Sequence, residues 1–429
     1  MNDIVRIRGQ KRLNGTISIN GSKNSVVALI PASLLAKDVV TFTNVPHIED
    51  VNSLLTTLSY LNVKTKFDGQ TLTIDSSKIS NKPLIGEEIK KVRASYYFMG
   101  ALLALFNEVV IREPGGCSIG ERPIDLHISG FEKMNVEVNY QDHIYTCKTP
   151  HLIGQTVVLK KVSVGATINL MIAMALADGV SIIENAAREP EIIDVANLIN
   201  HMGGCVKGAG TSTIIVVGAS KLRGCSYRVI PDRIETGTYA IIGAALGDEV
   251  FIENCNTNHC LALIYILKKI GVNLTVYDDV LIIKKSTNLT SINVETNPYP
   301  EFPTDLQQPL TTLLTQANGI SIIKENIYAK RTAHVIELNK MGANIEVYDN
   351  NIIIKGPTLL KGCQVSGKDL RGGASLVLAA LLAEGESYLH GFRHIKRGYD
   401  NIVNKLNKLG ADISFIKKGD NDVAENNNG

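Results

Sequence analysis

The chain has 429 residues, 45% of them hydrophobic, which is enough to bury two cores in domains of about 200 residues each. Its 44 Lys and Arg residues nearly balance 42 Asp and Glu residues, which excludes a global attraction to nucleic acid or to an anionic membrane. Any anion-binding site must therefore be built locally.

The cysteines and the apolar segments favour a soluble, cytoplasmic protein. The longest apolar run, near residues 96–106, is too short to span a bilayer, and the first residues lack the apolar core of a signal peptide. Residues 419–429 are polar and predict a disordered tail. The seven cysteines are scattered, without the spacing of a disulfide framework or a zinc site: Cys117, Cys147, Cys205, Cys225, Cys255, Cys260 and Cys363.

A short signature, in which an apolar residue precedes Gly or Asn and then a strand pattern, recurs six times. Each copy ends an amphipathic helical pattern, as at 192–199, and precedes a hairpin pattern, as at 273–283. Gly and Asn favour the left-handed conformation that ends a helix. Successive positions are 73, 68, 68, 71 and 68 residues apart: Asn62, Asn135, Gly203, Gly271, Gly342 and Gly410.

Upstream of each signature lie a helical pattern rich in Ala and Leu and a β-like run. The β-like runs are 39–42, 108–111, 180–183, 249–252, 320–323 and 386–389. Each unit is therefore predicted to be strand, helix, strand, helix, strand, strand. One such unit cannot bury its own faces, so several units must pack together. We expect a mixed α/β (α+β) fold with three units in each domain, with the helices inside and mixed sheets outside.

Two loops recur in every unit and carry the polar chemistry. The first opens the Ala-rich helix, at 21–24, 92–95, 163–166, 232–235, 302–305 and 370–373. Exposed helix amides beside a cation favour an anion. The second follows the β-like run, at 44–46, 114–123, 185–190, 254–256, 325–331 and 390–397.

Cations on these loops predict a site for a multiply charged anion, if equivalent loops converge. The residues are Lys23, Arg93, Arg122, Arg331, Arg371 and Arg397. Guanidinium groups suit phosphate and carboxylate. For any single Arg, the alternative is an ordinary surface salt bridge.

Residues 113–123 place Cys117 and Arg122 on one glycine-rich loop bounded by prolines. A nearby cation and exposed amides favour the thiolate, which predicts a reactive thiol. The alternative is a surface turn with an incidental cysteine.

Other motifs are weak. The sequence has no His-Glu-x-x-His pattern, phosphate loop or dinucleotide fingerprint, so neither a metal site nor a cofactor is predicted. The acidic residues Glu189, Glu191 and Asp194 are interpreted as a charge cluster at a helix start rather than a catalytic pair.

Seven motifs together resemble the UDP-N-acetylglucosamine 1-carboxyvinyltransferase family of enolpyruvyl transferases, from about residue 4 to about residue 415. They lie at 21–24, 92–95, 114–127, 185–191, 231–238, 300–305 and 397–399. The resemblance implies transfer of the enolpyruvyl group of phosphoenolpyruvate to the 3-hydroxyl of UDP-N-acetylglucosamine, with release of phosphate, as the first committed step of peptidoglycan synthesis. It also implies two inside-out α/β barrels that close on the nucleotide sugar: residues 21–230, and residues 1–20 with 231–418.

The resemblance also implies residue roles. Cys117 would be the general acid, which can attack phosphoenolpyruvate covalently and is alkylated by fosfomycin. Asp305 would take the proton of the sugar hydroxyl, and Lys23 and Arg397 would complete the catalytic set. Phosphoenolpyruvate would contact Lys23, Asn24, Arg122, Arg331, Arg371 and Arg397. UDP-N-acetylglucosamine would contact Arg93, Arg122, Pro123, Ile124, Asp125, Leu126, Lys161, Val162, Ser163, Val164, Asp305 and Ile327.

The chain departs from the family pattern at Ser22, Ser25, Glu121, Ala329 and Lys330. Glu121 adds negative charge beside Arg122, so loop dynamics and phosphate affinity are expected to differ, without loss of activity. Two alternatives remain: an enolpyruvyl transferase that acts on shikimate 3-phosphate, and a non-catalytic protein that only binds nucleotide sugar. The 113–123 loop and residues 161–164 argue against the first, and the intact catalytic residues against the second.

Overall fold

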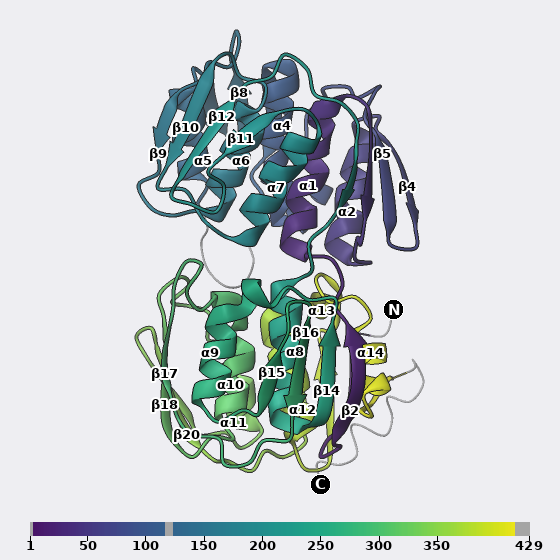
Figure 1. Ribbon diagram of the computed structural model, residues 1–429, viewed down its shortest axis with the longest axis vertical. Helices are drawn as coiled ribbons and strands as arrows, with labels where there is room; N and C mark the ends of the chain where they lie inside the picture. The colour runs from purple at the N-terminus through teal and green to yellow at the C-terminus, as the bar shows by residue number, and fades with distance from the viewer. Residues whose placement is uncertain (1–2, 116–122, 417–429) are drawn as a thin grey trace. The chain divides into compact units, whose positions relative to one another are not determined.

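The computed structural model describes residues 3–115 and 123–416, which form two compact units (Figure 1). One unit contains residues 21–115 and 123–231, and the other contains residues 3–20 and 232–416. Each unit has a hydrophobic core of its own. The predicted tail at 419–429 lies outside the described residues.

Among the described residues, four of six sheets share one strand arrangement. A central strand pairs in parallel with an edge strand and antiparallel with the last strand of a hairpin, whose first strand forms the other edge. In the sheet of the last repeat, two strands from opposite ends of the chain stand in place of the hairpin. The central strands all overlap the predicted β-like runs, which are thereby confirmed: β3 (Val39–Thr43), β6 (Glu108–Arg112), β10 (Val180–Glu184), β14 (Gly247–Glu253), β18 (Gly319–Glu325) and β22 (Glu386–His390).

The remaining strands complete these sheets. The parallel edges are β13 (Ser226–Arg228), β9 (Thr156–Val158), β2 (Leu13–Ser18), β17 (Asn293–Thr296) and β21 (Gln364–Ser366). The antiparallel partners of the central strands are β5 (Thr71–Asp75), β8 (Ile144–Lys148), β12 (Thr213–Val217), β16 (Val280–Lys284), β20 (Asn351–Gly356) and β1 (Ile4–Arg8). The other edges are β4 (Lys64–Asp68), β7 (Glu137–Gln141), β11 (Cys205–Lys207), β15 (Leu274–Val276), β19 (Ile345–Tyr348) and β23 (Asp412–Phe415).

One sheet departs from the predicted unit because its parallel edge is reduced to a single bridge between Leu84 and Ile111. Leu84 makes both hydrogen bonds of this bridge: its amide donates to the carbonyl of Val110, and its carbonyl accepts from the amide of Arg112. The sheet that contains β6 therefore has three strands.

Two edge strands, β2 and β13, each pair with the central strand of a repeat other than the one they precede in sequence. β2 precedes the first repeat in sequence but pairs with β14, and β13 precedes β14 in sequence but pairs with β3. β1 likewise fills the sheet of β22 and β23. The unit that contains β14 is therefore assembled from two separate stretches of the chain.

The helices that open each repeat are buried on nearly every side, and most of their residues are small or apolar. In Figure 1, strands lie on both sides of the helices within each unit. These helices are α1 (Lys23–Ser33), α4 (Tyr97–Phe106), α6 (Val164–Met174), α8 (Arg233–Leu246), α10 (Gln307–Leu314) and α12 (Leu370–Leu382).

The second helix of each repeat has one exposed face. These helices are α2 (Glu49–Tyr60), α5 (Asp125–Lys133), α7 (Pro190–His201), α9 (Leu261–Lys269), α11 (Ala333–Lys340) and α14 (Ile402–Lys408). The marker residue after each helix has a positive φ, between 62° and 102°, as the sequence predicts. Shorter helical segments are α3 (Glu87–Lys91), α13 (Arg393–Lys396), η1 (Leu34–Ala36), η2 (Arg93–Tyr96), η3 (Thr257–Cys260) and η4 (Thr304–Leu306).

Candidate active site

The first set of recurrent loops opens helices, as predicted. Four loops start α1, α6, α8 and α12 directly, and the other two form η2 and η4, which lead into α4 and α10. Ser22, Ser163, Asp232 and Asp369 cap their helices by accepting hydrogen bonds from first-turn amides. Capping fixes the backbone that carries each candidate side chain.

Asp305 lies in η4, where two buried arginines bind its carboxylate. Arg331 Nη1 donates to Oδ1 at 2.8 Å, and Arg371 Nη2 donates to Oδ2 at 3.3 Å. The Asp305 side chain is 27% exposed, whereas Arg331 and Arg371 are 4% and 2% exposed. The structure thus brings together three predicted site residues, of which the carboxylate is the most accessible.

Both arginines have spare hydrogen-bonding capacity. Arg331 Nε and Arg371 Nη1 are buried and have no hydrogen-bond partner among the described residues. A buried donor without an acceptor is costly, and guanidinium groups match carboxylate and phosphate oxygens. These two donors therefore suit a small anionic substrate.

The charge of Arg371 is stabilised at the start of α12. Its guanidinium carbon lies 5.2 Å from the centre of the Tyr399 ring, and Tyr399 Oη lies 2.8 Å from Thr238 Oγ1. Burial opposes the charge, but Tyr399 and the carboxylates of Asp305 and Asp232 outweigh it and raise the pKa of the guanidinium above its ordinary value. Arg371 is therefore a permanent cation.

Arg397 follows α13, which packs against the start of α12. The fit is tight, since a Cβ on Gly373 would lie 2.6 Å from Ile395 Cγ1. Burial, followed by Arg393 and Arg397, lowers the pKa of His394. Arg397 thus lies on the segment that packs against the helix of Arg371.

Lys23 is the first residue of α1, in the other unit, and forms an ion pair with Asp50 in the first turn of α2. Nζ and Oδ2 are 2.9 Å apart, and the two side chains are 14% and 4% exposed. Asn24 lies beside Lys23 in the same turn of α1. The amine is therefore held in place at a helix start.

Arg93 lies over Tyr96, with its guanidinium carbon 5.8 Å from the ring centre. Tyr96 packs edge to face on the buried His127, with ring centres 4.7 Å apart. Burial and the charge of Arg93 lower the pKa of His127 to about 3, so its ring is neutral near pH 7. Asn169 Nδ2 lies 3.0 Å from His127 Nδ1 and donates to the carbonyl of Tyr96.

The starts of α5 and α6 adjoin this cluster. A Cβ on Gly165 would lie 2.7 Å from Tyr96 Oη and 3.1 Å from His127 Nε2. The structure therefore gathers segments that contain most of the predicted nucleotide-sugar residues: Arg93, the α5 residues Asp125 and Leu126 with Pro123 and Ile124 before them, and Ser163 and Val164 at α6 with Lys161 and Val162 before them.

Cys117 and Arg122 lie outside the described residues. Ile327, the remaining predicted sugar contact, follows β18, and its backbone N–H donates to Glu325 Oε1 at 2.9 Å. It shares a unit with Asp305.

Sequence comparisons identify the chain's relatives. The profile of the family described as EPSP synthase (3-phosphoshikimate 1-carboxyvinyltransferase) matches residues 7–406. UDP-N-acetylglucosamine 1-carboxyvinyltransferase 2 of Streptococcus pyogenes serotype M3 is 47% identical over 415 residues, covering 96% of this chain and 99% of the relative. The Bacillus subtilis strain 168 protein of the same name is 45% identical over 422 residues, covering 98% of each chain.

The chain belongs to the EPSP synthase family, among the UDP-N-acetylglucosamine 1-carboxyvinyltransferases. Solved structures of enolpyruvyl transferases share its mixed α/β fold. NikO from Streptomyces tendae superposes with a TM-score of 0.88 at 24% identity, covering 96% of this chain and 98% of the other. EPSP synthase from Acinetobacter baumannii gives 0.75 at 19% identity, covering 96% and 100%.

Sequence reasoning missed Asp50 and Tyr399 as partners of family site residues. Asp50 is an acid in the first turn of α2, a position that ordinarily complements the helix dipole, so its sequence context does not reveal a partner on α1. Tyr399 ends the family motif at residues 397–399, but nothing in this motif predicts that its ring lies against the guanidinium of Arg371.

Glu189, Glu191 and Asp194, which the sequence predicts to be a charge cluster at a helix start, lie before or within the first turns of α7. Asp194 is buried and accepts a hydrogen bond from Tyr227 Oη at 2.6 Å. Burial raises the pKa of Asp194 to about 6, and the hydrogen bond from Tyr227 partly offsets this rise. This contact joins α7 to β13 and explains the buried carboxylate without a catalytic role.

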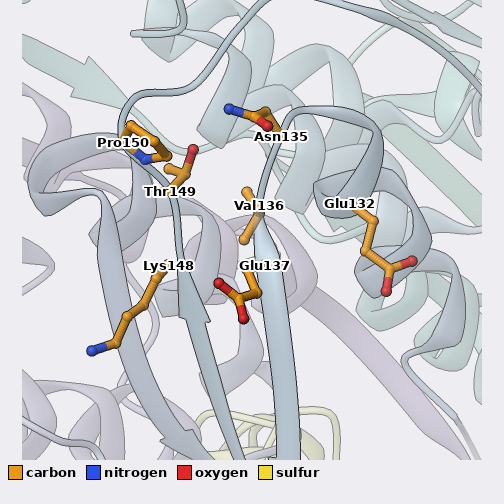
Figure 2. Close-up of a pocket in the computed structure, with 7 residues that line it drawn as sticks. All are labelled: Glu132, Asn135, Val136, Glu137, Lys148, Thr149 and Pro150. Carbon is orange, nitrogen blue, oxygen red and sulfur yellow. The ribbon is translucent and has the colours of Figure 1, made fainter.

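A surface hollow of about 410 Å³ lies elsewhere (Figure 2). Its lining residues are Glu132, Asn135, Val136, Glu137, Lys148, Thr149 and Pro150. Glu132 lies near the C-terminal end of α5, whereas the predicted sugar-binding residues lie at the N-terminal end. The hollow is therefore separate from the candidate site.

Within residues 3–115 and 123–416, no three His, Cys, Asp or Glu side chains cluster as metal ligands would. In the same ranges, every helix is too short or too polar to cross a membrane.

Proposed function

We propose that this protein transfers the enolpyruvyl group of phosphoenolpyruvate to the 3-hydroxyl of UDP-N-acetylglucosamine and releases phosphate, the first committed step of peptidoglycan synthesis. The observation that carries the proposal is the Asp305 carboxylate, partly exposed between two buried arginines that have unused donors. The names of full-length relatives at 45% to 47% identity support this substrate pair.

The proposed chemistry needs a base at the sugar hydroxyl. Asp305 is assigned this role, since an accessible carboxylate within hydrogen-bond reach of the hydroxyl can take its proton. Arg331 and Arg371 hold this carboxylate at both oxygens, which fixes its orientation. Their remaining donors are assigned to the carboxylate of phosphoenolpyruvate.

Phosphoenolpyruvate is assigned to Lys23, Arg122 and Arg397, which would bind its phosphate, and to Asn24. Cations that offset the charge of the tetrahedral adduct and of the departing phosphate lower the barrier to its formation and collapse. Cys117 is assigned as the acid that protonates the methylene carbon, on the basis of the family motif. Arg93, Arg122, residues 123–126, residues 161–164, Asp305 and Ile327 are assigned to the nucleotide sugar.

We further infer that each unit is an inside-out barrel, the first over residues 21–230 and the second over 1–20 and 231–418. The support is the burial of α1, α4, α6, α8, α10 and α12 on nearly every side, together with three sheets in each unit. The described cysteines are all free, which supports a reducing cytoplasm as the location.

The test is phosphate release with each substrate alone and with both together. We expect release only when phosphoenolpyruvate and UDP-N-acetylglucosamine are both present. Release with shikimate 3-phosphate in place of the nucleotide sugar, and none with the sugar, would assign the protein to the other branch of the family. Binding of nucleotide sugar without any release would indicate a non-catalytic protein.

A further inference from the structure

Glu325 ends β18 and places a buried carboxylate beside the candidate site. The residue is 1% exposed. Oε1 accepts hydrogen bonds from Thr296 Oγ1 at 2.8 Å, from the Ile327 amide at 2.9 Å and from the Tyr328 amide at 3.0 Å. Oε2 accepts from Thr304 Oγ1 at 2.9 Å. These four bonds use the acceptor capacity of a carboxylate.

Thr304 connects Glu325 to the pair formed by Arg331 and Asp305. A hydroxyl has a single hydrogen, and Thr304 directs it to Glu325, which leaves its lone pairs for Arg331 Nη1 at 3.1 Å. The same Nη1 donates to Asp305 Oδ1 at 2.8 Å. Each hydrogen bond therefore sets the direction of the next.

Glu325 also fixes the backbone that leads to Arg331. It accepts from two successive amides of the turn after β18, and the Arg331 amide donates to the carbonyl of Tyr328 at 2.8 Å. The guanidinium and the backbone of Arg331 are thus both tied to one carboxylate. Buried networks with every member satisfied specify one arrangement.

The geometry points to Glu325 as a positioning residue that, through Thr304, orients Arg331 against the Asp305 carboxylate. This assignment rests on the proposed function, in which Asp305 takes the proton of the sugar hydroxyl. Glu325 contacts neither substrate in this scheme. A simpler role would be to hold the turn after β18, without any effect that passes through Thr304.

Thr304→Val separates the two roles, because it removes the hydroxyl and leaves the bonds of Glu325 to the turn amides and Thr296 intact. We expect kcat to fall on the order of 100-fold, as misplacement of catalytic groups produces, with a much smaller change in KM for the nucleotide sugar. Thr304→Ser retains the hydroxyl and should restore turnover. Turnover of Thr304→Val close to that of the wild type would overturn the assignment.

Glu325→Gln tests the carboxylate itself. An amide has one acceptor oxygen, so it cannot serve both the turn amides and the Thr304 hydroxyl, and kcat should fall by at least as much as in Thr304→Val. In the double variant the two losses should not multiply, since they interrupt one chain of bonds. Multiplying losses would overturn the proposal.

The matched control is Glu337→Gln. Glu337 is a buried carboxylate on α11 in the same unit, bonded to Lys340 and to the Ser366 amide. It should keep wild-type turnover even where its melting temperature falls. Phosphate release absent from both the wild type and this control refutes the proposed function, whereas active enzymes with an active Thr304→Val refute the Glu325 assignment alone.

Discussion

Lys23 and Asp50 form a nearly buried ion pair between the first turns of α1 and α2, with Nζ 2.9 Å from Oδ2. Because Lys23 is assigned to the phosphate of phosphoenolpyruvate, the pair links substrate binding to the packing of two helices. Removing one charge of such a pair leaves the other buried without compensation.

For Asp50→Asn, we therefore expect KM for phosphoenolpyruvate to rise about tenfold, since Lys23 loses a partner that orients its amine. The free energy of unfolding should fall by about 3 kcal/mol, as seen when one partner of a buried pair is removed. Initial rates and urea unfolding measure the two effects. As a control, Asp248→Asn removes the partner of Arg12 in an exposed pair and should cost less than about 1 kcal/mol.

Asp305→Ala should retain binding of UDP-N-acetylglucosamine and lose turnover by orders of magnitude, because it removes the proposed base. Calorimetric titration with the nucleotide sugar and phosphate release measure the two properties. The variant also deprives Arg331 and Arg371 of their carboxylate, so its melting temperature must be recorded. Near-normal turnover would remove Asp305 from the mechanism.

Thiol chemistry should single out Cys117. Burial raises the pKa of Cys147 to about 12 and that of Cys255 to about 11, and it also raises the pKa of Cys225 and Cys363. Thiols with raised pKa values are poor nucleophiles at neutral pH. Because burial disfavours these four thiols and the family motif assigns the reactive thiol to Cys117, fosfomycin should add once, at Cys117, and faster when the nucleotide sugar is present.

Intact mass and peptide mapping would locate the adduct. Cys117→Ser should remain unmodified under the same conditions, and Cys147→Ser should react as the wild type does. An adduct on any thiol other than Cys117, or an unchanged mass in the wild type, would contradict the assignment of the reactive thiol.

Stability should depend on pH through Asp194. Burial raises its folded pKa from 3.8 to about 6, so the folded state binds the proton more tightly than the unfolded state does. The contribution of the protonated group is fully present below about pH 4 and is lost as pH rises through 6, a change of about 3 kcal/mol.

Asp194→Asn cannot ionise, so the wild type should lose stability relative to this variant between pH 4 and pH 6. Melting temperatures of both proteins across this range measure the effect. Asp75→Asn is the control of opposite sign: hydrogen bonds from Ser77 lower the pKa of the exposed Asp75, so its contribution is lost as pH falls. A constant difference between wild type and Asp194→Asn would contradict the prediction.

Gly100→Ala should destabilise the contact between α4 and α6. A Cβ at this position would lie 2.4 Å from the carbonyl oxygen of Asn169 and 2.6 Å from its Oδ1, and Gly100 N–H donates to that same Oδ1. We expect a loss of about 3 kcal/mol, measured by thermal unfolding. Gly86→Ala meets only the flexible end of Glu88 and should be tolerated.

The sequence predicts local features of this fold well because each has a local cause. Asn62 and Gly203, for example, adopt positive φ because a helix must end there, and Gly and Asn tolerate this conformation. Ser163 starts α6 because its hydroxyl accepts from the Ala166 amide. Because the repeats are similar, a feature identified in one of them is expected at the equivalent position of the other five.

Features that join distant residues were not predictable in this way. The exchange of β2 and β13 leaves no pattern in either segment, since parallel edge strands of different sheets look alike in sequence. The partnership of Lys23 with Asp50 spans 27 positions and depends on how α1 meets α2. A glutamate at the end of a strand, such as Glu325, is ordinary in sequence. Only its hydrogen bonds show that it lies beside Asp305.

The exchanged strands also impose an order of assembly during synthesis. Residues 21–231 emerge from the ribosome as a continuous stretch that holds every strand of its own three sheets, including β13. The earlier strands β1 and β2 must wait for β22 and β14, which emerge hundreds of residues later. The nascent chain thus completes residues 21–231 first, and it carries β2 unpaired until β14 emerges and β1 unpaired until translation nears the last repeat.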